Sequence, residues 1–320
     1  MLSRVADSLY WMSRYLERAE HSARLIDVNL NLMLDQSPAT AGQRWARLLS
    51  SLHAPPLSEA SHDAYRITQL MTFDVSNPTS IMACLETARD NLRQVREQIS
   101  SEMWEHLNRL FLQVKSNSIE DVWNVGPHEF FRSVREGAHL FQGITDSTMS
   151  HGEGWQFIQV GRFIERASAT ASLLDVYFKD FFDAESRHAG PGSYLDWVGL
   201  LKSCTAFEAY CKVYTAELRP ERIAEFLLLN AECPRSVRFS AEMIQNGFQA
   251  IAEATGMRKT GRLNRLAGRL RASLSFGQID EIMEAGLHAY LNDIRGQCAQ
   301  MHAAIQQTYI AYPIETALAS

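Results

Sequence analysis

Apolar residues recur at alternating spacings of three and four along the start of the chain, from Leu2 to Met33. A helix has about 3.6 residues per turn, so this spacing predicts an apolar seam along one face of a helix of about nine turns. Residues 157–181 carry a second such seam, and further helices are predicted over about 80–113 and 278–310. No segment shows the period of two that is typical of a half-buried strand. The predicted fold class is therefore all-α.

The two seams resemble each other at a constant offset of 148 residues, as residues 9–19 and 157–167 illustrate. An offset of 156 joins three further matches, including the identical tetrapeptide Leu-Asn-Arg-Leu that begins at Leu107 and again at Leu263. Self-similarity of this length indicates tandem duplication rather than a solenoid of short repeats. We predict a helical bundle of two units with pseudo-two-fold symmetry, packed as one globular body: residues 1–150, with Glu17-Arg18, and residues 151–320, with Glu165-Arg166.

Composition narrows the class of protein. The 320 residues are 46% hydrophobic and carry a net charge of -6, which argues against a general nucleic-acid binder, because such proteins neutralise phosphates. No run of about 18 apolar residues occurs, so no membrane span is predicted, and the amphipathic start lacks an apolar signal core. Five scattered cysteines favour buried thiols in a reducing compartment. The expected location is the cytoplasm.

Both seams carry the same charged triplet, formed by Arg14, Glu17 and Arg18 in one and by Arg162, Glu165 and Arg166 in the other. Neighbouring helix residues point about 100° apart, so Glu17 and Arg18 cannot pair well with each other, whereas Arg14 can reach Glu17 and Arg162 can reach Glu165. The triplets are expected to meet near the pseudo-two-fold axis. Structural pairing between helices is the favoured interpretation, and the alternatives are a ligand-binding cleft or catalytic carboxylates.

Metal and cofactor sites are not predicted. Glu17, Glu20 and His21 come near the glutamate and Glu-x-x-His pattern of di-iron bundles, but the spacing from Glu17 to His21 is one residue too long and the second unit has no histidine there. A glycine-rich phosphate loop is also absent from the sequence, so we expect the chain not to bind ATP by itself.

A basic stripe is predicted on one helical face near the end of the chain. Its spacings of three and four place four arginines together: Arg258, Arg262, Arg265 and Arg269. Such a stripe could receive an acidic protein, a phosphate or RNA. The favoured interpretation is a solvated face, because the first unit does not repeat this charge.

The chain resembles the bacterial Alpha-E family, an α-helical domain marked by a Glu-Arg motif. The resemblance covers essentially the whole chain and is carried by Leu2-Ser3-Arg4-Val5-Ala6, residues 9–20, Asn77-Pro78-Thr79-Ser80-Ile81, Gly154-Trp155-Gln156-Phe157 and residues 161–167. Members of the family are associated with circularly permuted ATP-grasp ligases and with transglutaminase-like proteins. The resemblance therefore implies a role beside an ATP-dependent system that forms amide or peptide bonds, and it implies no substrate.

The favoured function is a non-catalytic binding or scaffold subunit of such a ligase system, which could also form a homo-oligomer. One alternative is an enzyme of the same pathway that uses Glu17 or Glu165 as acid or base in a cleft between the units. That enzyme needs half-buried, unpaired carboxylates, because burial moves a pKa towards the working pH. The second alternative is binding of RNA or an acidic protein by the basic stripe at residues 258–271.

Overall fold

The computed structural model describes residues 1–33, 38–54, 63–186, 194–215, 217–256 and 261–310, and every regular element in these ranges is helical. The first half of the chain contains α1 Ser3–Met33, α2 Pro38–Ser51, α3 Ala64–Thr72, α4 Ile81–Arg93, a 3₁₀ turn Arg96–Gln98, α5 Ser101–Lys115, α6 Ile119–Val125 and α7 Pro127–Thr148. The second half contains α8 Glu153–Ser186, α9 Tyr194–Ser203, α10 Phe207–Tyr214, α11 Pro220–Leu229, α12 Val237–Ala254, α13 Arg262–Phe276, α14 Ile279–Ala285, α15 Leu287–Ile305 and a π-helical turn Gln306–Ile310. The all-α prediction is confirmed.

Two of the predicted helices are interrupted. The segment expected at about 80–113 ends at Arg93 and restarts at Ser101, because the Ser100 side chain accepts a hydrogen bond from Met103 N and so caps a new helix. The segment expected at 278–310 breaks at Gly286, whose φ of 105° lies in the region that favours glycine. Apolar spacing continues across both breaks, so spacing alone did not reveal them.

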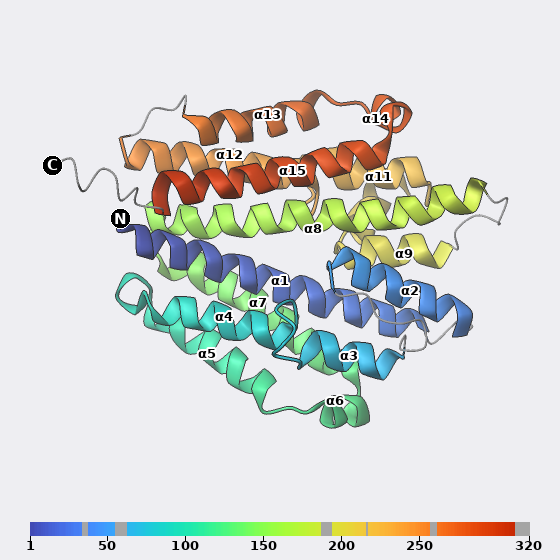
Figure 1. Cartoon of the computed structure of the whole chain (residues 1–320), viewed down its shortest axis with the longest axis horizontal. Coiled ribbons are helices and arrows are strands. Elements are labelled where there is room, and N and C mark those ends of the chain that lie inside the picture. The colour runs from blue at the N-terminus through green and yellow to red at the C-terminus, as the bar shows by residue number, and fades with distance from the viewer. Residues whose placement is uncertain (34–37, 55–62, 187–193, 216, 257–260, 311–320) are drawn as a thin grey trace.

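The long helices α1 and α8 lie side by side through the middle of the molecule (Figure 1). Helix α1 packs against α4 and α7, and α5 completes this group of four by packing against α4 and α7. Helix α8 packs in the same way against α12 and α15, with α13 completing the second group. The short helices cross over, since α2 packs on α8 and α9 packs on α1. The predicted seams form the centre of this core, as the burial of Leu9, Met12, Ile26, Phe157 and Ile164 shows.

Helices α1 and α8 run parallel and touch closely near their first turns. A Cβ atom on Gly161 would lie 2.3 Å from Ser13 Oγ and 2.5 Å from the Tyr10 carbonyl oxygen, so only glycine fits there. One turn further on, this close approach brings the two charged triplets within reach of each other. Within the described part of the chain, no helix has the length and apolar content needed to cross a membrane.

Candidate functional site

The two triplets meet between α1 and α8 and pair across the helices. Arg14 Nε and Arg18 Nε each lie 2.8 Å from an oxygen of Glu165. Arg166 donates to both oxygens of Glu17, from Nε at 2.7 Å and from Nη2 at 2.9 Å. The ion pairs of both glutamates therefore run between the helices, and among the described residues neither glutamate pairs with the arginine three residues before it. The close approach at Gly161 puts the opposite helix nearer than the next turn of the same helix.

Glu17 lies in a deep cluster of charges. Its side chain is only 1% exposed, and Arg235, from the turn before α12, donates to it at 2.9 Å. The neighbouring carboxylate of Glu20 is fully buried and binds both Arg235 and Arg24. Burial alone would raise the pKa of Glu17, but attraction to Arg166 and Arg235 outweighs burial and lowers the pKa to about 2. Glu17 is therefore a carboxylate at neutral pH.

His21 adjoins this cluster and is neutral at pH 7. Burial, followed by repulsion from Arg235, lowers its pKa to about 4. Its Nε2 atom is buried and has no hydrogen-bond partner among the described residues. Glu20 pairs with Arg24 and Arg235, and the His21 ring is buried beside them. The described residues contain no group of three or more His, Cys, Asp or Glu side chains that could hold a metal ion.

Glu165 lies in a shallower cluster. Its side chain is 12% exposed, and attraction to Arg14 and Arg18 lowers its pKa although burial opposes this. Arg14 also donates from Nη1 to Tyr10 Oη at 3.2 Å, and its guanidinium lies 4.9 Å from the centre of the Trp11 ring. The hydrogen-bonding capacity of Arg14 is therefore well used inside the protein.

Further along the two helices, Asp27 of α1 and Asp175 of α8 each bind one histidine and one arginine of a neighbouring helix. Asp27 binds His128 at 2.7 Å and Arg135 at 2.9 Å. Asp175 binds His288 at 2.5 Å and Arg295 at 3.4 Å. Sequence reasoning did not select these side chains. The signal was present, because Asp27 and Asp175 stand between apolar residues at matching positions of the two seams.

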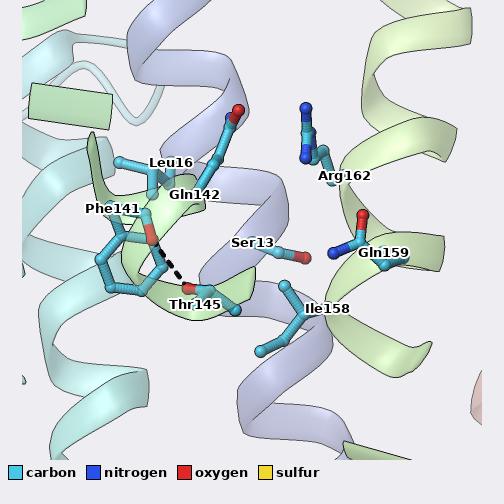
Figure 2. A pocket seen from close by; sticks show the side chains of 8 residues that line it. All are labelled: Ser13, Leu16, Phe141, Gln142, Thr145, Ile158, Gln159 and Arg162. Atoms are coloured by element: carbon cyan, nitrogen blue, oxygen red, sulfur yellow. Dashed lines mark hydrogen bonds between the residues drawn. The ribbon is translucent and has the colours of Figure 1, made fainter. Parts of the chain in front are cut away.

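Arg162 lines a small cavity between α1, α7 and α8 (Figure 2). The cavity has a volume of about 20 Å³, which is enough for about one water-sized group. The lining is partly polar and consists of Ser13, Leu16, Phe141, Gln142, Thr145, Ile158, Gln159 and Arg162. No glutamate lines this cavity.

The basic stripe lies on the outer helix α13, away from the paired triplets. Arg262, Arg265 and Arg269 are exposed, as expected for one face of this helix, and Arg262 donates to Gln307 at 2.8 Å. Arg258, the remaining predicted member, lies outside the described residues. The structure therefore does not bring the stripe together with the Glu-Arg motifs.

The paired carboxylates between α1 and α8 fit a structural or ligand-binding role better than a role in acid–base catalysis. A general acid at neutral pH needs a raised carboxyl pKa, whereas the pKa values of Glu17 and Glu165 are both lowered. Each of these carboxylates is held by at least two arginines. The half-buried, unpaired carboxylate that the acid–base alternative requires is not found at either motif.

Similarity to known proteins covers nearly the whole chain. The model of the Alpha-E family, described as a predicted alpha-helical domain with a conserved ER motif, matches residues 1–310. The uncharacterised proteins Mb2597 of Mycobacterium bovis and Rv2567 of Mycobacterium tuberculosis are each 22% identical to the chain over 324 aligned positions, covering 95% of it. The chain spans only 36% of the length of these relatives. No solved structure is significantly similar.

Proposed function

The chain belongs to the Alpha-E family, and we propose that it is a non-catalytic binding or scaffold subunit beside an ATP-grasp-type ligase that forms amide or peptide bonds. The observation that carries the non-catalytic role is the reciprocal pairing of Glu17 and Glu165 with arginines of the opposite helix. These carboxylates join α1 to α8 and have no free oxygen poised for a substrate. The ligase connection rests on the family resemblance.

The relatives support the idea of a helical module that works with another protein part. Because the chain spans about a third of the two mycobacterial proteins, each of them carries a long additional segment on the same polypeptide. In such proteins this helical module is covalently joined to other material. We propose that the present chain likewise works in contact with a ligase or a transglutaminase-like protein. All five cysteines are free thiols, which fits action in the cytoplasm.

We also propose that the chain arose by duplication of one four-helix unit. Ser80 and Ser236 cap α4 and α12 alike, each accepting a hydrogen bond from the backbone N–H three residues later. Gly126 and Gly286 both adopt positive φ, at 122° and 105°, before α7 and α15. A crystal structure should superpose the helices of residues 1–150 on those of residues 151–320 by a rotation near 180°. Helices that fail to superpose in this order would contradict the duplication.

Co-purification tests the proposed function. The chain is tagged at its chromosomal locus, purified from its native bacterium at its natural level, and its bound proteins are identified by mass spectrometry. We expect an ATP-grasp or transglutaminase-like protein in stoichiometric amount, and none with the tag alone. The purified chain by itself should not consume ATP when given amines and carboxylates.

Two results would contradict this proposal. Recovery of the chain alone, at natural expression and low salt, would remove the scaffold role. ATP-dependent amide formation by the isolated chain would show that it is an enzyme, and loss of that activity in Glu17→Gln or Glu165→Gln would identify its carboxylate.

A further inference from the structure

Arg14 and Arg162 hold the same place in the two motifs but have different surroundings. Arg14 donates to Glu165 and to Tyr10 Oη and lies against Trp11. Arg162 has no hydrogen-bond acceptor among the described residues, and its ion pair with Glu17 is long, at 3.9 Å. Its Nε atom is nevertheless buried, and its guanidinium lies 5.0 Å from the Phe163 ring. Buried donors of this kind are rare without a partner.

The side chains next to the two arginines explain the difference. Beside Arg14, the space is filled by Tyr10, Trp11 and His302, whose rings stack or meet edge to face. At the matching places beside Arg162 stand the smaller Ile158, Gln159 and Gln142.

Gln142 follows His128, which binds Asp27, and His302 follows His288, which binds Asp175. The number of residues between the two is the same in both helices, so Gln142 and His302 occupy matching positions. Smaller side chains around Arg162 leave the cavity of about 20 Å³ that the aromatic rings fill around Arg14.

The cavity presents hydrogen-bond donors to its interior. Figure 2 shows the Ser13 and Gln159 side chains pointing toward each other across the space between the helices, with Gln142 and Arg162 on either side of it. The Ser13 hydroxyl already donates to the Tyr10 carbonyl oxygen at 2.8 Å, so the available donors are those of Gln142, Gln159 and Arg162. The Gln159 side chain is only 7% exposed and makes no hydrogen bond to the described residues. The Gln142 amide reaches Glu17 only at 3.5 Å, so it too retains donor capacity. The Arg162 side chain is 22% exposed, which leaves a path from solvent.

The surrounding charge favours an anion. Among the described residues, ion pairs within 4.0 Å link three glutamates (Glu17, Glu20 and Glu165) to six arginines, namely Arg14, Arg18, Arg24, Arg162, Arg166 and Arg235. Positive charge therefore exceeds negative charge at the α1–α8 contact. Burial, followed by repulsion from Arg166, lowers the pKa of Arg162 to about 10. Excess buried charge of one sign is costly unless a counter-ion compensates it.

We infer that this cavity binds one carboxylate group, held by the Arg162 guanidinium and by the amide N–H groups of Gln142 and Gln159. A guanidinium matches the two oxygens of a carboxylate in geometry and charge. The cavity has room for about one oxygen-sized group, so one carboxylate oxygen enters it while the second oxygen and the rest of the ligand lie on the solvent side, where the Arg162 side chain is 22% exposed. The inference stands on this cavity alone and does not depend on the ligase partner of the proposed function.

Nitrogen-detected NMR on the full-length protein tests the inference. The buried Arg162 Nε–H gives a signal that is assigned by its disappearance in Arg162→Lys. Acetate, N-acetylglycine, N-acetylglycinamide and chloride are titrated separately from the same low-salt buffer. We expect the two carboxylates to shift this signal saturably and the uncharged amide to leave it unmoved. The Arg14 Nε–H, already bound to Glu165, should not move and serves as an internal control.

Matched variants locate the site. Gln159→Leu removes one donor at similar volume and should weaken acetate binding at least about tenfold, the effect of losing one charge-assisted hydrogen bond. Gln249→Leu, at an exposed position of α12, should bind acetate as the wild type does. Unfolding should shift to higher temperature in acetate for the wild type and for Gln249→Leu only.

Three outcomes would overturn the inference. An unmoved Arg162 signal at 100-fold excess of both carboxylates over protein would mean that water alone occupies the cavity. Equal saturable shifts by chloride and acetate would assign the site to a spherical anion. Equal shifts of the Arg14 and Arg162 signals would show a general ionic effect. None of these results bears on whether a ligase co-purifies with the chain.

Discussion

Glu17 and Glu165 occupy the same position in the two motifs, yet the clusters around them differ in depth. Glu165 is held by two arginines and remains 12% exposed. Glu17 is held by Arg166 and Arg235, is 1% exposed, and adjoins a second buried carboxylate, Glu20. The two clusters therefore share one feature, the pairing of a glutamate of one helix with arginines of the other. The deep cluster occurs on one side only, around Glu17.

The charges that deepen this cluster have uncharged residues at the matching positions of the other half. Where the first half has Glu20 and Arg24, the matching positions of the second have Ser168 and Ser172. Arg235 likewise corresponds to Thr79. A buried charge without a partner costs several kcal/mol, so such residues are tolerated only together. Removing single members from the deep cluster should therefore cost more than removing their counterparts from the shallow one.

Glu17→Gln should give the largest effect. The change leaves Arg166 and Arg235 with an uncompensated buried charge, and we expect a loss of about 3–5 kcal/mol in the free energy of unfolding. Urea denaturation followed by circular dichroism measures it. The double variant Glu17→Gln/Arg166→Met should recover part of the loss, since it also removes one of the stranded charges. A Glu17→Gln variant as stable as the wild type would refute the view that this cluster is tightly coupled.

His21 should make the stability of the deep cluster depend on pH below neutrality. Its pKa in the folded protein is about 4, whereas an unfolded histidine titrates near pH 6.5. Between these values the unfolded state binds more protons, so stability falls as the pH is lowered from about 6.5 to 4, by up to about 3 kcal/mol. His21→Gln should lose less stability over this range when both proteins are denatured with urea at each pH. Parallel profiles would contradict the assignment.

Glu165→Gln should cost less, about 1–2 kcal/mol. Arg14 keeps its bond to Tyr10, and Arg18 is 25% exposed and can turn to water. Because the pKa of Glu165 is lowered by folding, its contribution is present above the usual carboxyl pKa and disappears as the pH falls through the lowered one. The same urea titration measures this, with Glu17→Gln as reference. A loss equal to that of Glu17→Gln would show that depth does not separate the clusters.

Charge reversal on the outer helix should have the smallest effect. Arg262→Glu/Arg265→Glu alters exposed positions of α13, and we expect a change within about 0.5 kcal/mol in stability. The same variant tests the basic stripe as a binding surface. Salt-sensitive binding of RNA or an acidic protein that is lost on reversal would support that alternative, and binding that survives reversal would eliminate it.

The periodicity of apolar residues predicted the long helices well because α1 and α8 are buried along most of their length. Leu9, Met12, Phe157 and Ile164 are all in the core, as their spacing predicted. The pairing within the motifs could not be predicted in the same way. Spacing fixes which residues share a helix face, but the contact at Gly161 decides which opposite residues they meet.

Arg235 and Glu20 were missed for a different reason. Attention to positions that agree between the two halves selects the shared triplets and passes over positions where the halves differ. Glu20, Arg24 and Arg235 all differ, and all three carry charge on one side only. Three charged residues whose matching positions in the other half are uncharged were a usable signal for a buried network. The network was hard to recognise because Glu20 and Arg24 lie in α1, whereas Arg235 lies far away in the sequence, in the turn before α12.

The pairing of α1 with α8 has a consequence during synthesis of the protein. Residues 1–150 leave the ribosome first, and domains begin to collapse as they emerge. The face of α1 that later meets α8 then has no partner helix. Because that face carries Arg14, Glu17, Arg18 and Glu20, the nascent chain offers water a charged surface where a wholly apolar one would invite aggregation.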